Sequence, residues 1–217
     1  MRRYALIGVL SLATCVALAQ RLPEPRPNLK GDLTLPVPLA PKLFDDITEN
    51  IGRIGLRLQY PFAKGLGVGV GGDATWFGIE ERSLLPYSVS GEIFRSCYFG
   101  QAQYEHYFAE RSFYEFAAEA GLAEYRYHSS LATHVPKDRG FHWGVHMGYY
   151  LHASDALAFS LRIGYEVDDV QLSPDKLGID EFPGRIIDGP QGPFRFFTFG
   201  LGFSTTFGRS EGARADG

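Results

Sequence analysis

The sequence predicts an all-β fold, an eight-stranded antiparallel up-and-down β-barrel that crosses a membrane. Apolar residues alternate with polar or small ones in eight stretches, and a period of two is typical of strands with two unlike faces. The connections between the stretches alternate between short and long, as in a meander that closes on itself. The chain has 26 Gly and 14% aromatic residues in 217, which suits a β-rich domain better than a helical one.

The first twenty residues predict an export signal. Arg2 and Arg3 precede a mostly apolar run, residues 4–18, and Ala-Leu-Ala at 17–19 fits a small-x-small cleavage site. The run is too short to be a comfortable membrane span. Cys15 lies inside it, which disfavours lipid attachment at that cysteine.

Four segments are expected along the chain. We expect a signal peptide at residues 1–19, a Pro-rich leader at 20–27, the barrel at 28–207 and a flexible tail at 208–217. Cleavage would remove two arginines from a chain with a formal net charge of −4, and an acidic protein has no electrostatic footprint for nucleic acid. Cys97 would be the only cysteine left, which excludes an intramolecular disulfide.

The first four strands are expected between residues 28 and 108. Residues 28–37 read NLKGDLTLPV, where Leu and Val alternate with Lys, Asp and Thr. Residues 53–60, RIGLRLQY, oppose Ile, Leu and Tyr to Arg and Gln. Residues 66–76, LGVGVGGDATW, oppose apolar residues to Gly, Asp and Thr. Residues 93–108 oppose Phe, Tyr and Ala to Arg, Gln and Glu.

The last four strands follow the same rule. Residues 113–127 oppose Tyr, Phe, Ala and Leu to Glu and Gly. Residues 141–151, FHWGVHMGYYL, oppose large apolar residues to His and Gly. Residues 157–169 oppose Leu, Phe, Ile and Tyr to Ser, Arg, Glu and Asp. In residues 194–207, FRFFTFGLGFSTTF, a row of mostly Phe and Leu alternates with Thr, Gly and Ser.

The connections place all short turns at one end of the barrel and all long loops at the other. Short turns are expected near residues 61–65, 109–112 and 153–156, and long loops at 38–50, 77–91, 129–140 and 173–192. In the first long loop, a short amphipathic helix is expected to begin at Pro41.

Period two alone leaves open which face points outward. A soluble lipocalin-like carrier would turn its apolar face inward, and a membrane barrel would turn it outward. The polar face is rich in glycine, which makes room for long charged side chains inside a narrow barrel. These glycines are Gly67, Gly69, Gly71, Gly121, Gly144, Gly148, Gly164, Gly200 and Gly202. The apolar face carries aromatic rings near strand ends, as in the interfacial girdles of membrane barrels.

Over residues 28–207 the pattern resembles small eight-stranded outer-membrane barrels of the OmpA and OmpX type. In the last strand, Phe199, Leu201, Phe203 and Phe207 resemble the C-terminal signal that the barrel-assembly machinery reads. The chain departs from that pattern because RSEGARADG follows Phe207. The resemblance implies insertion in a Gram-negative outer membrane, with the short turns and both termini in the periplasm. It also implies contact with outer-membrane lipid and lipopolysaccharide.

The inward face would carry a network of charged residues. Its expected members are Lys30, Asp32, Arg53, Arg57, Asp73, Arg95, Glu105, Glu115, Glu119, Arg162, Glu166 and Asp168. Buried charges cost several kcal/mol each unless they are paired and hydrogen-bonded. We therefore expect salt bridges that plug the lumen, with a narrow channel as the alternative.

A polar row at the end of the fifth strand suggests a rim site. Glu124, Arg126, His128 and Ser130 continue the outward row of Leu122, so they must emerge at head-group level. The His-x-Ser spacing resembles that of outer-membrane lipid A deacylases, which would make His128 the base, Ser130 the nucleophile and Glu124 an orienting carboxylate. Leu131 stands where those enzymes carry asparagine. The alternative is a solvated rim or a contact of Arg126 with phosphate.

Two other motifs carry less weight. Gly67 to Gly72 matches G-x-G-x-x-G, but the strand pattern continues through it and no helix follows. His142 and His146 share a strand face and lie too far apart to chelate one ion without carboxylates from neighbouring strands. We expect them to be hydrogen-bonded lumen histidines, and we expect no metal or cofactor.

The sequence therefore favours a non-enzymatic outer-membrane barrel with a structural or surface-interaction role. Loops on a rigid scaffold often carry function, so an extracellular or envelope protein partner would contact the long loops. Residues 173–192 are the expected contact region. A lipid A or phospholipid hydrolase, a narrow channel and a soluble carrier remain as alternatives.

Overall fold

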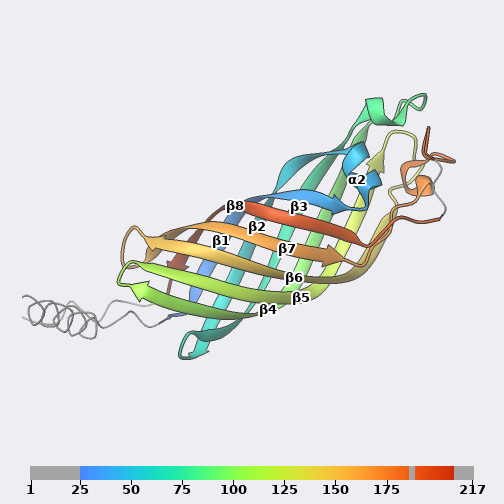
Figure 1. Ribbon diagram of the computed structural model, residues 1–217. Helices are drawn as coiled ribbons and strands as arrows, with labels where there is room; N and C mark the ends of the chain where they lie inside the picture. Colours follow the sequence, from blue (N-terminus) through green and yellow to red (C-terminus); the bar gives the residue numbers. More distant parts are fainter. Residues whose placement is uncertain (1–24, 186–188, 208–217) are drawn as a thin grey trace, which may run out of the picture.

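A closed barrel of eight antiparallel strands forms the molecule (Figure 1). The computed structural model describes residues 25–185 and 189–207. Each strand pairs with its neighbour in sequence, and the last strand pairs with the first, from Asn28↔Thr206 to Ala40↔Arg195. The predicted fold class is confirmed. The predicted signal peptide and tail, and most of the predicted leader, lie outside the described residues.

The strands match the predicted stretches and are mostly longer. They are β1 (Asn28–Ala40), β2 (Thr48–Ala63), β3 (Leu66–Ile79), β4 (Gly91–Ala109), β5 (Ser112–Ser129), β6 (Lys137–His152), β7 (Leu157–Asp168) and β8 (Phe194–Thr206). A helix, α2 (Lys42–Ile47), follows Pro41 as predicted. Two 3-10 turns, η1 (Glu81–Leu84) and η2 (Pro174–Leu177), lie in later long loops. In the described residues, no helix has the length and apolar character needed to cross a membrane.

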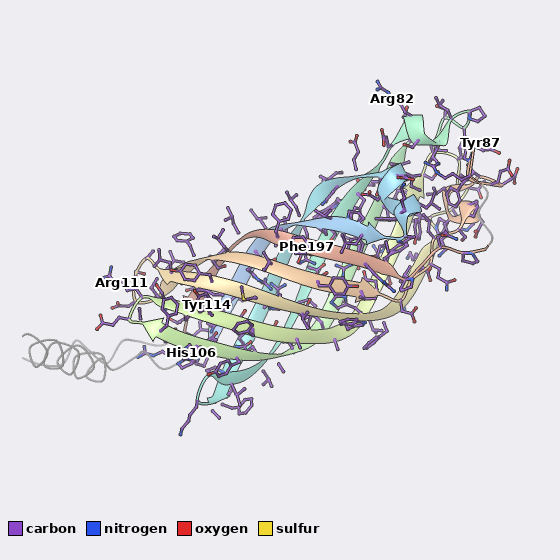
Figure 2. All side chains as sticks on the ribbon, viewed as in Figure 1. Arg82, Tyr87, His106, Arg111, Tyr114 and Phe197 are labelled. Atoms are coloured by element: carbon purple, nitrogen blue, oxygen red, sulfur yellow. The ribbon has the colours of Figure 1, made fainter. Side chains whose placement is uncertain are left out.

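The apolar face of every strand points away from the barrel axis. Leu201 on β8 is 64% exposed, whereas Arg57 on β2 is 1% exposed. Figure 2 shows Tyr114 and Phe197 on this outer wall, where both side chains are exposed. A soluble carrier would need the opposite arrangement, with its apolar face around an inner cavity. The orientation is that of a barrel surrounded by hydrocarbon.

Glycine on the inner face makes room for the charged side chains. A Cβ added at Gly71 would lie 2.8 Å from Cγ of Arg57 and 2.8 Å from Cε2 of Phe99. A Cβ at Gly55 would lie 2.8 Å from Oδ2 of Asp32. Real Cβ atoms do not approach so closely, so a larger residue at either position would displace the charged groups.

The barrel interior is layered, which the sequence did not predict. At the long-loop end, α2, η1 and the β7–β8 loop fold over the lumen and bury an apolar cluster. Its largest members include Phe44, Phe77, Tyr125, Phe182, Phe194 and Phe196. The rings of Phe44 and Phe194 lie 4.6 Å apart between centroids. At the short-turn end, Tyr107, Phe113, Tyr150 and Ala158 form a second buried cluster.

The β7–β8 loop, where we expected the contact region at residues 173–192, is partly buried. Its Leu177, Ile179 and Phe182 are buried in the apolar cluster at the long-loop end. A bridge between Leu172 and Gln191 closes the base of the loop. These three apolar side chains fill the space above the ionic lumen and are removed from water. Contact of a partner with the exposed residues of this loop stays a prediction.

Candidate functional site

All twelve residues of the expected charged network point into the lumen between the two apolar clusters. They are Lys30, Asp32, Arg53, Arg57, Asp73, Arg95, Glu105, Glu115, Glu119, Arg162, Glu166 and Asp168, and each is buried. Alternation alone places them there, because each lies on the inward parity of its strand. Their contacts divide them into three groups along the barrel.

The group nearest the short turns is centred on Lys30 of β1. Its Nζ donates to Oε1 of Glu105 at 2.7 Å and also to Glu115. The ammonium lies 4.5 Å from the centroid of the Tyr150 ring. Gln59 donates to Oε2 of Glu115 at 3.1 Å. A single cation thus joins two carboxylates from β4 and β5 above the aromatic cluster.

The middle group is centred on Asp32 of β1. Oδ2 of Asp32 accepts hydrogen bonds from Arg57 and, at 2.7 Å, from Arg162. Arg57 also lies near Glu119 of β5, with 3.9 Å between Nε and Oε2. These contacts connect β1, β2, β5 and β7 across the lumen.

The group nearest the long loops is centred on Arg95 of β4. Arg95 donates to Oδ1 of Asp73 at 2.5 Å and to Oδ2 of Asp168 at 2.7 Å. Arg53 donates to both carboxylate oxygens of Glu166 at 2.6 Å. Tyr125 donates to Asp168 at 2.5 Å. Every acceptor in this group is a carboxylate oxygen, so these are charge-assisted hydrogen bonds, which are shorter and stronger than neutral ones.

Two histidines of β6 connect these groups, and both lie on the inner face as expected. Nδ1 of His142 lies 2.7 Å from Oδ1 of Asp168, and its Nε2 lies 3.3 Å from Oε1 of Glu119. His146 lies 3.5 Å from Glu119 and 3.7 Å from Glu115. Glu119 is therefore shared by the two imidazoles. The network as a whole extends through the middle of the lumen.

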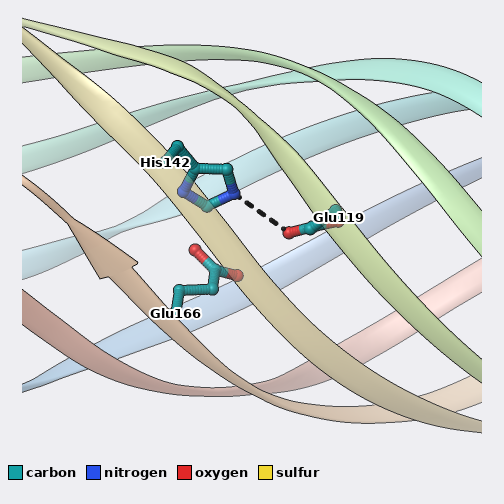
Figure 3. A group of neighbouring side chains, drawn as sticks. All are labelled: Glu119, His142 and Glu166. Atoms are coloured by element: carbon teal, nitrogen blue, oxygen red, sulfur yellow. Dashed lines mark hydrogen bonds and ion pairs between the residues drawn. The ribbon is translucent and has the colours of Figure 1, made fainter.

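Glu119, His142 and Glu166 form the group most similar to a metal site (Figure 3). One potential ligand atom from each lies within 4.8 Å of the others. However, Glu166 already accepts from Arg53, and Nη2 of Arg95 lies 3.5 Å from its Oε2. A divalent cation there would be repelled by both guanidiniums. The geometry fits an ion-pair network better than a metal centre.

The rim residues do not form the arrangement that a hydrolase requires. Both oxygens of Glu124 accept hydrogen bonds from arginines, one from Arg126 and the other from Arg139. Ser130 follows the end of β5, and its Oγ accepts from the backbone N–H of Ser90 at 3.0 Å. In the part of the chain that the structure describes, no hydrogen bond links His128 to Ser130 or Glu124. The three candidate catalytic residues are not assembled into a triad.

Glu124 lies beyond the apolar wall, and its environment favours the charged form. Hydrogen bonds from Arg126 and then from Arg139 lower the pKa of the Glu124 carboxyl below its ordinary value. The rim is thus a charged cluster of one carboxylate and two guanidiniums.

The four residues that resemble an assembly signal are accessible from outside. Phe199, Leu201 and Phe203 lie on the outer face of β8, and the exposed Phe207 follows the strand. Their recognition by the assembly machinery stays a prediction.

No protein-family model and no curated protein matches the sequence. Among solved structures, the barrel is similar to Neisserial surface protein A, with 10% identity and a TM-score of 0.52 over 83% of this chain and 97% of that chain. It is also similar to the outer membrane protein OprG from Pseudomonas aeruginosa, with 13% identity and a TM-score of 0.51 over 85% of this chain and 96% of that chain. At such identities the likeness concerns the fold, and it confirms the resemblance to small eight-stranded outer-membrane barrels.

Proposed function

We propose that the protein is a non-enzymatic barrel of a Gram-negative outer membrane, exported by a cleaved signal peptide, with a structural or surface-interaction role. Its lumen is plugged rather than conducting. The observation that carries this proposal is the layered interior, in which an ion-pair network lies between two apolar clusters. The likeness of the fold to outer-membrane barrels supports the compartment.

The ionic layer supports a plug because its charged side chains pair with one another across the lumen. The single side chain of Arg95 contacts carboxylates from both β3 and β7, and that of Lys30 contacts carboxylates from both β4 and β5. An ion entering the lumen would have to break such pairs, and an unpaired buried charge costs several kcal/mol. Narrow barrels of eight strands have an interior just wide enough for side chains to fill.

The two ends support the same proposal. At the short-turn end, the rings of Phe113 and Tyr150 stack at 4.6 Å, and those of Phe113 and Tyr107 stack at 4.7 Å. At the other end, Phe44 of α2 packs on Phe77 at 5.0 Å. Each end therefore places an apolar barrier in the path of a hydrated ion.

The surface role is assigned to the two loops that keep apolar side chains in the open. Leu85 in the β3–β4 loop is 65% exposed, and Leu131 and Val135 in the β5–β6 loop are also exposed. These residues lie on loops at the end that the proposed orientation places outside the cell. Exposed apolar residues on loops suit contact with an extracellular or envelope protein.

Conductance in a planar lipid bilayer tests the plug. The refolded chain should give no steady channels, whereas steady openings on the nanosiemens scale would show a conducting lumen. The conductance of the wild type is compared with that of a variant in which a Gly-Ser linker replaces residues 174–185. This replacement removes the η2 region and its buried apolar residues, which are part of the apolar barrier at the long-loop end. Membrane fractionation with a heat-modifiability gel tests the compartment independently, because a folded outer-membrane barrel migrates differently before heating.

A further inference from the structure

We propose that Arg126 and Arg139, held on the two oxygens of Glu124, form a binding site for the phosphate group of a membrane lipid. This inference rests on the proposed outer-membrane orientation and adds a ligand class to it. The site lies on the outer wall of β5 and β6, apart from the lumen network.

One carboxylate fixes the positions of both guanidiniums. Nε and Nη2 of Arg126 lie 2.8 and 2.7 Å from Oε1 of Glu124. Nε and Nη2 of Arg139 both lie 2.6 Å from Oε2 of the same residue. Each arginine therefore uses one edge of its guanidinium for Glu124. The other edge, with the Nη1 donors, is available for an acceptor, and arginine forks match phosphate oxygens well.

The exposure of the three side chains favours an anionic ligand. The Glu124 side chain is only 14% exposed, whereas those of Arg126 and Arg139 are 42% and 75% exposed. A ligand approaching from outside thus meets the cations before the carboxylate. Lys137, paired with Arg126 across the β5–β6 ladder, adds a further exposed positive charge.

Three carboxylates lie within or beside the patch. Glu92 of β4 is exposed and lies opposite His128, two register positions further from the apolar wall than the pair of Phe94 and Arg126. Asp169 is the third acid: it is exposed, and its backbone N–H donates to the carbonyl of Phe141 at 2.8 Å, next to Arg139 on the outer face. Counting Glu92, Glu124 and Asp169 against Arg126, Lys137 and Arg139 leaves the patch without net charge when histidine is neutral, so the attraction for phosphate rests on the exposed guanidinium edges rather than on excess charge. The Arg126 guanidinium also lies 6.0 Å from the Phe94 ring, which helps to fix its position.

The position of the patch identifies the ligand as a lipid rather than a soluble anion. Arg126 continues the outward row of Leu122, and Arg139 continues that of Phe141, and both of these apolar side chains are exposed. A molecule seated here would place hydrocarbon against Leu122 and Phe141 and its anionic group against the arginines. Basic clusters directly beside a membrane surface bind anionic head groups in this way.

The test measures binding of bisphosphorylated lipid A to the full chain, refolded in a neutral detergent. We expect the double variant Arg126→Gln/Arg139→Gln to weaken binding by about tenfold or more, because charge-assisted hydrogen bonds to phosphate are strong. Arg111→Gln is the matched control, since this exposed arginine lies at the opposite end of the barrel (Figure 2). A heat-modifiability gel verifies that each variant is folded.

Glu124→Gln distinguishes a preorganised site from general positive charge. This variant adds one positive charge to the patch but removes the group that holds both guanidiniums. A preorganised site predicts weaker binding, and simple charge attraction predicts tighter binding, which would overturn the proposal. Three other results would also overturn the proposal. Dephosphorylated lipid A could bind as tightly as the bisphosphorylated form, inorganic phosphate could compete as well as lipid A does, or the double variant could bind as tightly as the wild type. Because membrane fractionation is measured separately, a protein found in outer membranes that fails this test refutes only the phosphate site.

Discussion

His142 lies between two carboxylates, with its Nε2 3.3 Å from Oε1 of Glu119 and its Nδ1 2.7 Å from Oδ1 of Asp168. When both ring nitrogens face carboxylate oxygens, the form that satisfies the geometry is the imidazolium, which donates from both. The twelve-residue network contains seven carboxylates and five lysines or arginines. His142 is therefore an inner-face group that can supply part of the missing positive charge.

The first prediction concerns this histidine. His142→Gln should lower the free energy of unfolding by about 3–5 kcal/mol, because removal of one partner leaves a buried carboxylate unneutralised. His106→Gln is the control, since His106 is exposed at the short-turn end of β4 (Figure 2). Urea unfolding of the barrel in lipid vesicles measures the difference. Equal stability of the two variants would show that His142 does not neutralise Glu119 and Asp168.

The second prediction concerns Arg95, which contacts Asp73, Glu166 and Asp168. Arg95→Met removes the positive charge that neutralises three carboxylates. It should lower the free energy of unfolding of the barrel by at least about 3–5 kcal/mol. Arg95→Lys keeps the charge but has no planar fork, so it should recover only part of this loss. The same urea measurement ranks the three proteins. A lysine variant as stable as the wild type would mean that the charge alone matters.

Local alternation was enough to predict this charged network. Asp168 and Arg95 lie on the inward parity of their strands, and their burial follows from one face being covered by hydrocarbon. Which charged residues pair with each other could not be predicted, because the pairing depends on the barrel register. The contact between Arg53 and Glu166, for example, joins residues 113 positions apart. The rim serine was misjudged for a related reason, since Ser130 lies past the end of β5 and follows the loop rather than the strand.

The apolar cluster at the long-loop end was missed because its strand residues and its loop residues are distant in sequence. Ile93 and Phe99 share the inward parity of Arg95, so alternation alone places them in the lumen. They share a buried cluster with Phe44 of α2 and Phe182 of the β7–β8 loop. No periodic pattern in a loop reports where its side chains will pack, and only the closed barrel brings them together.

The third prediction concerns the space that glycine leaves around Arg57. Gly71→Val should prevent the barrel from closing or strongly destabilise it, since even a Cβ would lie 2.8 Å from Arg57 and Phe99. Gly78→Val lies on the same strand, where the nearest atom to an added Cβ is 3.8 Å away. The fraction of heat-modifiable protein after refolding measures closure. Similar folding of both variants would mean that the lumen tolerates added volume.

The fourth prediction tests which end of the barrel faces the cell exterior. Arg82 in η1 and Arg111 in the β4–β5 turn are both exposed, and they lie at opposite ends (Figure 2). In the proposed orientation, a membrane-impermeant maleimide should label Arg82→Cys in intact cells. It should label Arg111→Cys only after the outer membrane is permeabilised. The native Cys97 is buried in the lumen and gives little background because a maleimide cannot reach it. Labelling of Arg111→Cys but not Arg82→Cys in intact cells would reverse the topology and place the long loops in the periplasm.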